Sequence, residues 1–87
     1  MGKVITELEK TILLSALILS KGNTKKHFKE DDIVLKFPMR QRKTVRRFFK
    51  KLVKEGYIIE STNKNYKLSE EGLKIASRLL YEGGTFV

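Results

Sequence analysis

The sequence predicts one small α+β domain, mostly helical, spanning residues 1–87. Apolar residues recur every three or four positions in several segments, which is the spacing of amphipathic helices. Two short segments rich in β-branched and aromatic residues flank a polar turn, which indicates an antiparallel hairpin. A chain of 87 residues with 40% hydrophobic and 33% charged residues fits one folded domain.

The first predicted helix covers residues 6–20. Thr6 and Glu9 form a capping box, in which each side chain accepts a bond from the other residue's backbone N–H. The body of the helix is apolar around more than one face, so it needs cover on two sides. Either it is the central helix of the core, or a second subunit covers part of it. Gly22 is expected to end it as the C′ residue.

A polar connection leads to a second, shorter helix. We expect a short strand around residues 26–28 and the helix over about 31–37. The acids at positions 30–32 complement the positive end of the helix dipole. Because consecutive helical residues do not share a face, these acids are not expected to bind a metal. His27 has no partner at ligand spacing and is expected on the surface, and Pro38 stops the helix.

A third helix is predicted from Pro38 or Gln41 to Glu55, with Gly56 terminating it. Its apolar residues recur at spacings of three and four and should form one buried face. They are Val45, Phe48, Phe49, Leu52 and Val53. The other side of this helix is left to basic residues.

The last third of the chain is predicted to form a hairpin, a capped helix and a short tail. The segments are a strand over 57–62, a turn at 63–65, a strand over 66–68, a cap at Ser69, a helix over about 70–82 and a tail at 83–87. The predicted order is therefore helix, short strand, helix, helix, strand, strand, helix. Two helices joined by a short turn and followed by a hairpin form a winged helix-turn-helix.

The charge of the chain is concentrated in one segment. Nine of its 19 basic residues lie between Lys36 and Lys54, where there is no acid, and the rest of the chain is balanced at ten basic and ten acidic residues. The formal net charge of +9 therefore comes from this segment. Exposed helices usually alternate cations with Glu, so we expect these cations to be unpaired and to meet a polyanion.

Several functional classes are disfavoured by what the sequence lacks. Without cysteine, neither a disulfide framework nor a thiolate metal site is expected. Without a signal-peptide pattern or an apolar segment of about 20 residues, we expect a cytoplasmic protein. The single histidine, the lack of a Gly-rich phosphate loop and the lack of paired carboxylates outside helix starts disfavour an enzyme. We therefore expect no metal, no cofactor and no small-molecule ligand.

Two motifs resemble transcriptional regulators of the prokaryotic and archaeal winged helix-turn-helix type. Residues 44–58, TVRRFFKKLVKEGYI, resemble the recognition-helix segment, in which Thr-Val opens the helix body and a Gly leads into an aliphatic strand. Residues 66–72, YKLSEEG, resemble the passage from the wing to the last helix. The resemblance covers residues 5–82. This chain departs from the pattern at residues 37–40, where such regulators often carry a capping Ser or Thr, and in its short wing turn.

The resemblance implies binding to double-stranded DNA, with the helix of about 40–55 in the major groove and a short wing at 61–66. Arg can bond guanine twice, Gln can pair with adenine, and the later lysines should reach phosphates. The implied DNA-binding residues are Arg40, Gln41, Arg42, Lys43, Thr44, Arg46, Arg47, Lys50, Lys51, Asn63, Lys64 and Asn65. A homodimer would read half-sites about 34 Å apart. The expected dimer contacts are Leu8, Ile12, Leu13, Leu79, Leu80 and Phe86.

Two other functions remain open. The chain could be a winged helix that binds proteins, as a subunit of a larger complex, or a protein that organises DNA without sequence preference. RNA binding is disfavoured because a helix cannot enter the narrow major groove of A-form RNA.

Overall fold

The computed structural model describes residues 6–62 and 64–82. The elements are α1 (Glu7–Ser20), β1 (Phe28–Lys29), α2 (Glu30–Val34), the 3₁₀-helix η1 (Met39–Gln41), α3 (Arg42–Lys54), β2 (Ile58–Glu60), β3 (Asn65–Leu68) and α4 (Glu70–Glu82). The predicted α+β class and the predicted order of helices and strands are confirmed over these residues.

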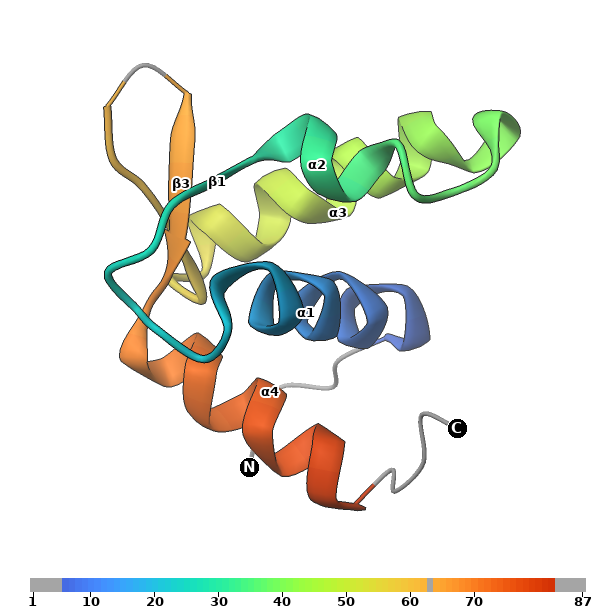
Figure 1. Ribbon diagram of the computed structural model, residues 1–87. Coiled ribbons are helices and arrows are strands. Elements are labelled where there is room, and N and C mark those ends of the chain that lie inside the picture. The colour runs from blue at the N-terminus through green and yellow to red at the C-terminus, as the bar shows by residue number, and fades with distance from the viewer. Residues whose placement is uncertain (1–5, 63, 83–87) are drawn as a thin grey trace.

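The helices are arranged around α1, and the sheet closes one end of the molecule. Figure 1 shows α1 between α3 and α4, with the hairpin of β2 and β3 to one side. The three strands form one antiparallel sheet in the order β1-β3-β2. Phe28 lies opposite Tyr66 and Ile58 opposite Leu68. The sheet therefore joins the short strand before α2 to the hairpin after α3.

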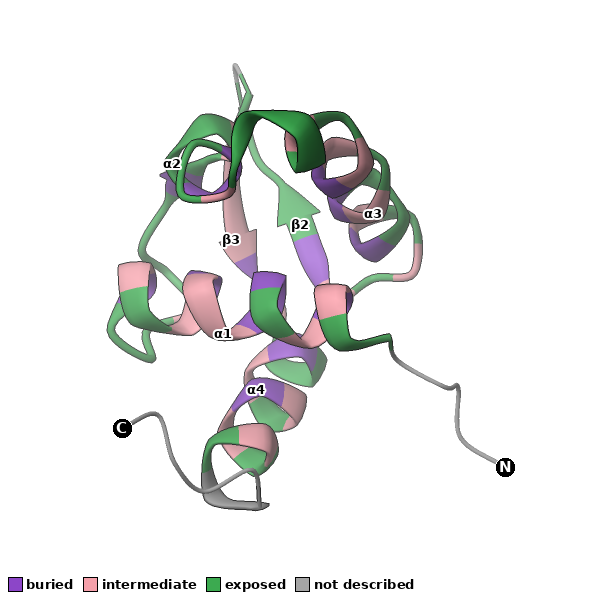
Figure 2. Ribbon diagram, turned by 90° about the vertical axis from the view of Figure 1, so that its right-hand side faces the viewer, coloured by how far each residue is buried: buried purple, intermediate pink, exposed green. Residues whose placement is uncertain are grey.

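The core is built on α1 and on the apolar face of α3. Fully buried side chains of α1 and α3 are Ile12, Leu13, Ala16, Val45, Phe49 and Leu52. The sheet adds Phe28, Ile58 and Leu68, and the edge of the Phe49 ring packs on Tyr66 with ring centroids 4.8 Å apart. Figure 2 shows these buried segments facing the interior. Burying each large apolar side chain stabilises the fold by about 1.5–3 kcal/mol.

The burial of α1 corrects two of the predicted dimer contacts. Ile12 and Leu13 are each 0% exposed within a single chain, so no second subunit can contact them. The interpretation of α1 as the central core helix is confirmed, because α3 and α4 cover it from two sides. The other predicted contacts are Leu8 and Leu79, both half-buried, Leu80, which is exposed, and Phe86, which lies outside the described residues.

The predicted start and the predicted last residue of α1 are confirmed, but the predicted C′ residue is wrong by one position. The Glu9 N–H donates to Thr6 Oγ1 at 3.2 Å, and the Thr6 N–H donates to Glu9 Oε1 at 3.0 Å. At the other end Lys21, not Gly22, occupies the C′ position, with a left-handed φ of 54°. Gly22 follows at φ 75° and donates its N–H to Leu17 O, so the two residues together close a Schellman motif.

The junction between α2 and α3 is tighter than predicted. Helix α2 ends at Val34, three residues before the expected end. The Arg42 guanidinium donates from Nε to Phe37 O at 3.0 Å and from Nη2 to Leu35 O at 3.3 Å. These carbonyls lie in the turn after α2, where no continuing α-helix supplies backbone N–H groups to donate to them. Arg42 thus fixes the turn to the first residue of α3.

Helix α4 begins against Tyr57, the residue just before β2. Ser69 Oγ accepts from the Gly72 N–H at 3.0 Å and donates to Tyr57 O at 3.1 Å. The predicted cap at Ser69 and the predicted span of this helix are confirmed. Gly72 is buried, and the Tyr57 carbonyl oxygen occupies the space that a Cβ at this position would need.

Candidate nucleic-acid interface

The solvent face of α3 carries a continuous row of cations. Lys43, Arg47, Lys50 and Lys54 are all exposed and recur at intervals of four, three and four residues. At 3.6 residues per turn this spacing aligns them along one side of the helix, over about 16 Å. We call these four residues the α3 stripe. Because Val45, Phe49 and Leu52 fix the opposite face in the core, the stripe cannot turn inward.

Phe48 supports two cations at the edge of this row. Its ring is half-buried, and the Arg47 guanidinium carbon lies 5.7 Å from the ring centroid. Lys51 Nζ lies 5.8 Å from the same centroid. Cations over an aromatic face are attracted by its quadrupole, so Phe48 orients both side chains as well as contributing to the core.

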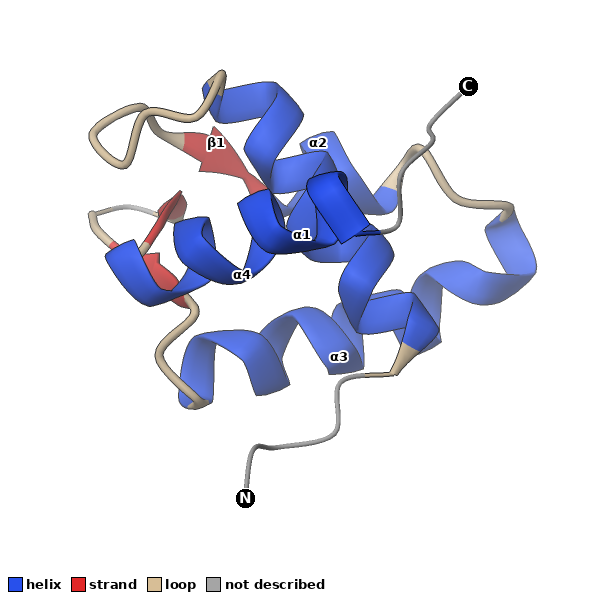
Figure 3. Ribbon diagram, turned by 90° about the horizontal axis from the view of Figure 1, so that it is seen from below, coloured by secondary structure: helices blue, strands red, loops and turns tan. Residues whose placement is uncertain are grey.

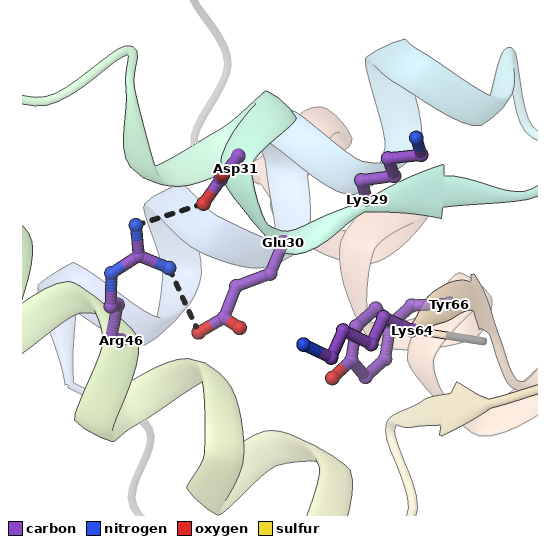
Figure 4. A pocket seen from close by; sticks show the side chains of 6 residues that line it. All are labelled: Lys29, Glu30, Asp31, Arg46, Lys64 and Tyr66. Carbon is purple, nitrogen blue, oxygen red and sulfur yellow. Dashed lines mark hydrogen bonds and ion pairs between the residues drawn. The ribbon is translucent and has the colours of Figure 1, made fainter.

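Arg46 is held by acids of α2. Its Nη2 atom donates to Asp31 Oδ1 at 2.8 Å, and its Nη1 atom lies 3.7 Å from Glu30 Oε2 (Figure 4). The hydrogen bond that Arg46 donates to Asp31 is the main cause that raises the pKa of Arg46 above its ordinary value; desolvation opposes it, and the negative charges of both acids add to it. Arg46 therefore links α3 to the start of α2.

The expectation that the cations of this segment are unpaired is wrong for two of them. Arg46 pairs with α2, and Lys51 Nζ lies 3.8 Å from Glu9 Oε2, a carboxylate only 2% exposed at the start of α1. The segment itself contains no acid, but neighbouring elements bring acids to it in space. Among the described residues, no ion pair forms to any member of the α3 stripe.

The other predicted residues of this segment divide by exposure. Arg40 and Gln41 are exposed in η1, ahead of the stripe. Thr44 is half-buried, and the Arg42 guanidinium donates hydrogen bonds to carbonyls of the turn after α2. The surface that is open to a ligand therefore begins at η1 and continues along the α3 stripe, with Arg42 and Arg46 on its inner side.

The turn of the hairpin carries one exposed cation. The Ser61 N–H donates to Asn65 O at 2.7 Å, and the Asn65 N–H donates to Thr62 O at 2.9 Å. Lys64 is exposed in a left-handed conformation with φ 64°, and Asn65 is half-buried in β3. Asn63, also predicted to contact DNA, lies outside the described residues. The hairpin offers Lys64 as its charged contact.

A hollow of about 310 Å³ lies between α2, α3 and the hairpin. Its lining residues are Lys29, Glu30, Asp31, Arg46, Lys64 and Tyr66 (Figure 4). Burial, followed by the negative charges of Glu60 and Glu30, raises the pKa of Tyr66 above its ordinary value. Oε2 of Glu30 is buried and accepts no hydrogen bond from the described residues. The hollow thus mixes both signs of charge, unlike the α3 stripe.

An apolar groove lies on a different surface, between α1 and α4. It encloses about 400 Å³ and is lined by Leu14, Leu17, Ile18, Lys21, Gly22, Ser77 and Leu80. Ile18 is 62% exposed and Leu80 43% exposed, which is high for large apolar residues. Of the five predicted dimer residues in the described part of the chain, Leu80 alone lines this groove.

Sequence reasoning missed the acids that hold Arg46 and Lys51, and it missed the lysines between α1 and β1. The signal for the lysines was present, because no acid occurs between Glu9 and Glu30. His27 is exposed in that connection, as expected. None of the helices in residues 6–62 and 64–82 combines the length and apolar character that crossing a bilayer would require.

Comparison of the chain with models of known protein families gave no match, and comparisons with curated proteins and with solved structures gave none either.

Proposed function

We propose that this chain is a winged helix-turn-helix protein that binds double-stranded DNA with α3 in the major groove and acts as a transcriptional regulator. The observation that carries the proposal is the α3 stripe, in which four exposed cations lie in line without an intramolecular ion pair among the described residues. Aligned cations repel one another, and a duplex with one negative charge per about 1.7 Å of axis relieves that repulsion.

The element order supports the same proposal. A short helix, a turn and the basic helix α3 are followed by a hairpin whose turn carries Lys64. In such a domain the second of the two helices lies in the major groove and its first residues meet base edges. Arg40 and Gln41 of η1 and Lys43 of α3 are the exposed residues at that end of the helix. Lys50 and Lys54, further along, reach phosphates.

Arg42 and Arg46 take a different part in this proposal. Both have donors committed to the turn after α2 or to the acids of α2. They fix the angle between α2 and α3, base reading depends on Arg40, Gln41 and Lys43, and Arg47 contacts phosphates together with Lys50 and Lys54. Thr44, half-buried beside them, packs at the turn.

In this proposal the chain acts as a homodimer through α1 and α4. The groove between these helices exposes Ile18 and Leu80, and two copies facing each other across it would shield both side chains. A twofold axis there makes the dimer read two half-sites, about 34 Å apart.

The proposal is tested by fluorescence anisotropy with a random duplex of about 30 base pairs, titrated at salt concentrations from about 50 to 200 mM. The R47Q/K50Q variant should bind more weakly, and its slope of log K against log[salt] should be shallower by about 1.8. The K74Q/R78Q variant removes the same charge from exposed positions of α4 and serves as the matched control. Failure of the wild-type chain to bind at the lowest salt would refute DNA binding.

A second candidate function is binding to another protein, and the apolar groove favours it. Under this alternative the exposed Ile18 is the contact, and R47Q/K50Q leaves partner binding intact. An Ile18→Ser variant that keeps wild-type DNA affinity for a single site but loses a protein partner would favour it. A third candidate, DNA organisation without sequence preference, predicts equal affinity for a site selected from a random library and for random duplex.

A further inference from the structure

A second basic surface lies in the connection between α1 and β1. Lys25 and Lys26 are exposed there, and no acid occurs in the sequence between Glu9 and Glu30. Among the described residues, no ion pair forms to either lysine, and we call these two residues the connection lysines. The equal numbers of basic and acidic residues outside residues 36–54 do not reveal this cluster, because the acids lie in other parts of the sequence.

The backbone of this connection is held by a chain of hydrogen bonds. The Gly22 N–H donates to Leu17 O, and the Asn23 N–H donates to Ser20 O. Asn23 then accepts twice, from the Lys26 N–H at its carbonyl and from the Lys25 N–H at Oδ1, 2.8 Å away. The backbone of the connection lysines is therefore fixed, and only their side chains have to move to reach phosphates.

The connection lysines and the α3 stripe lie on different sides of the molecule. The strand that follows the connection, β1, occupies the opposite edge of the sheet from β2, which follows α3. Figure 1 shows the connection at the base of the hairpin, away from its turn, and Figure 3 shows α3 and this connection on opposite sides. The molecule measures 32 × 30 × 28 Å.

One short duplex cannot contact both surfaces. DNA has a persistence length of about 150 base pairs, so a duplex of about 15 base pairs is effectively a straight rod. A rod seated along the α3 stripe lies on the side of the β2 edge of the sheet, whereas the connection lysines precede β1, at the opposite edge. Whatever anion they meet belongs to a second segment.

We infer that the connection lysines bind the phosphates of a second DNA duplex segment, so that a single chain bridges two duplexes. This inference rests on the proposed function of α3. The contact is to phosphates alone, since the turn offers lysines and no element that can enter a groove. It therefore carries no sequence preference and weakens with salt. In this inference α3 recognises a DNA site, and the connection lysines bring a distant DNA segment to it.

Energy transfer between two duplexes of about 15 base pairs, one carrying a donor dye and one an acceptor, tests the inference. The full chain should bring them together at about 50 mM salt and release them as salt rises. The K25Q/K26Q variant should lose about tenfold or more in bridging while its affinity for one duplex, measured by anisotropy, changes less than about twofold. The K74Q/R78Q variant, with the same charge removed from α4, should bridge like the wild type.

The outcomes separate this inference from the proposed function. Single-duplex binding without bridging by the wild type would overturn the inference alone. Bridging that persists in K25Q/K26Q would also overturn it, because the two duplexes would then be held by the α3 helices of a dimer. Absence of any duplex binding would overturn both. Loss of bridging in K25Q/K26Q, with unchanged sedimentation of the free protein, would establish it.

Discussion

Asp31 Oδ1 accepts a hydrogen bond of 2.8 Å from Arg46 Nη2, so an acid of α2 holds an arginine of the basic helix α3. Glu30 stands beside it, 3.7 Å from Nη1 of the same guanidinium. The contact fixes the two helices relative to each other. It also places two negative charges beside the surface proposed to meet phosphates, where they oppose binding to any duplex.

Replacing Asp31 by Asn should strengthen binding to a random duplex. The change removes a negative charge and weakens the charge-assisted hydrogen bond that holds Arg46, so affinity should rise several-fold and the salt slope should steepen by about 0.9. Anisotropy at several salt concentrations measures both. Asp32→Asn is the matched control, because Asp32 accepts from the Lys29 N–H and forms no described contact with Arg46. Equal effects of the two changes would show that charge alone, and not the release of Arg46, is responsible.

Replacing Gly72 by Ala should destabilise the fold, although Ala is the better helix former. A Cβ at this position would lie 2.1 Å from Tyr57 O and 3.2 Å from Leu68 Cδ2. The start of α4 must then move away from the hairpin, which costs about 1–3 kcal/mol and outweighs the gain of about 1 kcal/mol in helix propensity. Thermal unfolding followed by circular dichroism should show a lower Tm. Lys74→Ala, exposed on the same helix, should leave the Tm nearly unchanged.

Replacing Lys21 by Gly should stabilise the fold. Lys21 has a φ of 54°, a left-handed conformation that costs a non-glycine residue about 1–2 kcal/mol. Glycine adopts it without strain but loses more entropy on folding, so a net gain of about 0.5–1 kcal/mol is expected. Urea unfolding measures the change. Lys25→Gly should not stabilise, since Lys25 has no positive φ; stabilisation by both changes alike would contradict the explanation.

The elements that follow local rules could be predicted from the sequence. The capping box of Thr6 and Glu9 and the cap at Ser69 depend on residues three positions apart, so pattern alone identifies them. The apolar spacing of α3 likewise predicted that Val45, Phe49 and Leu52 would be buried. The order of helices and strands followed from these signals.

Features that depend on contacts distant in sequence could not be predicted in the same way. The bond from Arg46 to Asp31 spans 15 residues, and the approach of Lys51 to Glu9 joins α3 to α1. Charge counted along the chain made the basic segment appear unpaired, and only folding brought the acids to it. The early end of α2 has the same origin, because Arg42 of the next helix bonds the carbonyls of the turn.

Ionisation of Tyr66 should destabilise the fold at alkaline pH. Burial and the charges of Glu60 and Glu30 raise its pKa above the ordinary value of 10.0, so the folded state favours the neutral phenol. The stabilisation is fully present below the unfolded pKa and is lost as pH rises through the folded pKa. Tyr66→Phe removes this contribution while keeping the aromatic contact with Phe49, so its stability should fall less steeply above pH of about 10. Urea unfolding from pH of about 9 to 11 measures the two slopes, and the 295 nm absorbance lost in the variant gives the Tyr66 pKa directly.

Glu60→Gln should lower that pKa, because it removes one of the charges that oppose ionisation. A midpoint at or below the ordinary value in the wild-type chain would contradict the assigned environment of Tyr66 between α2, α3 and the hairpin.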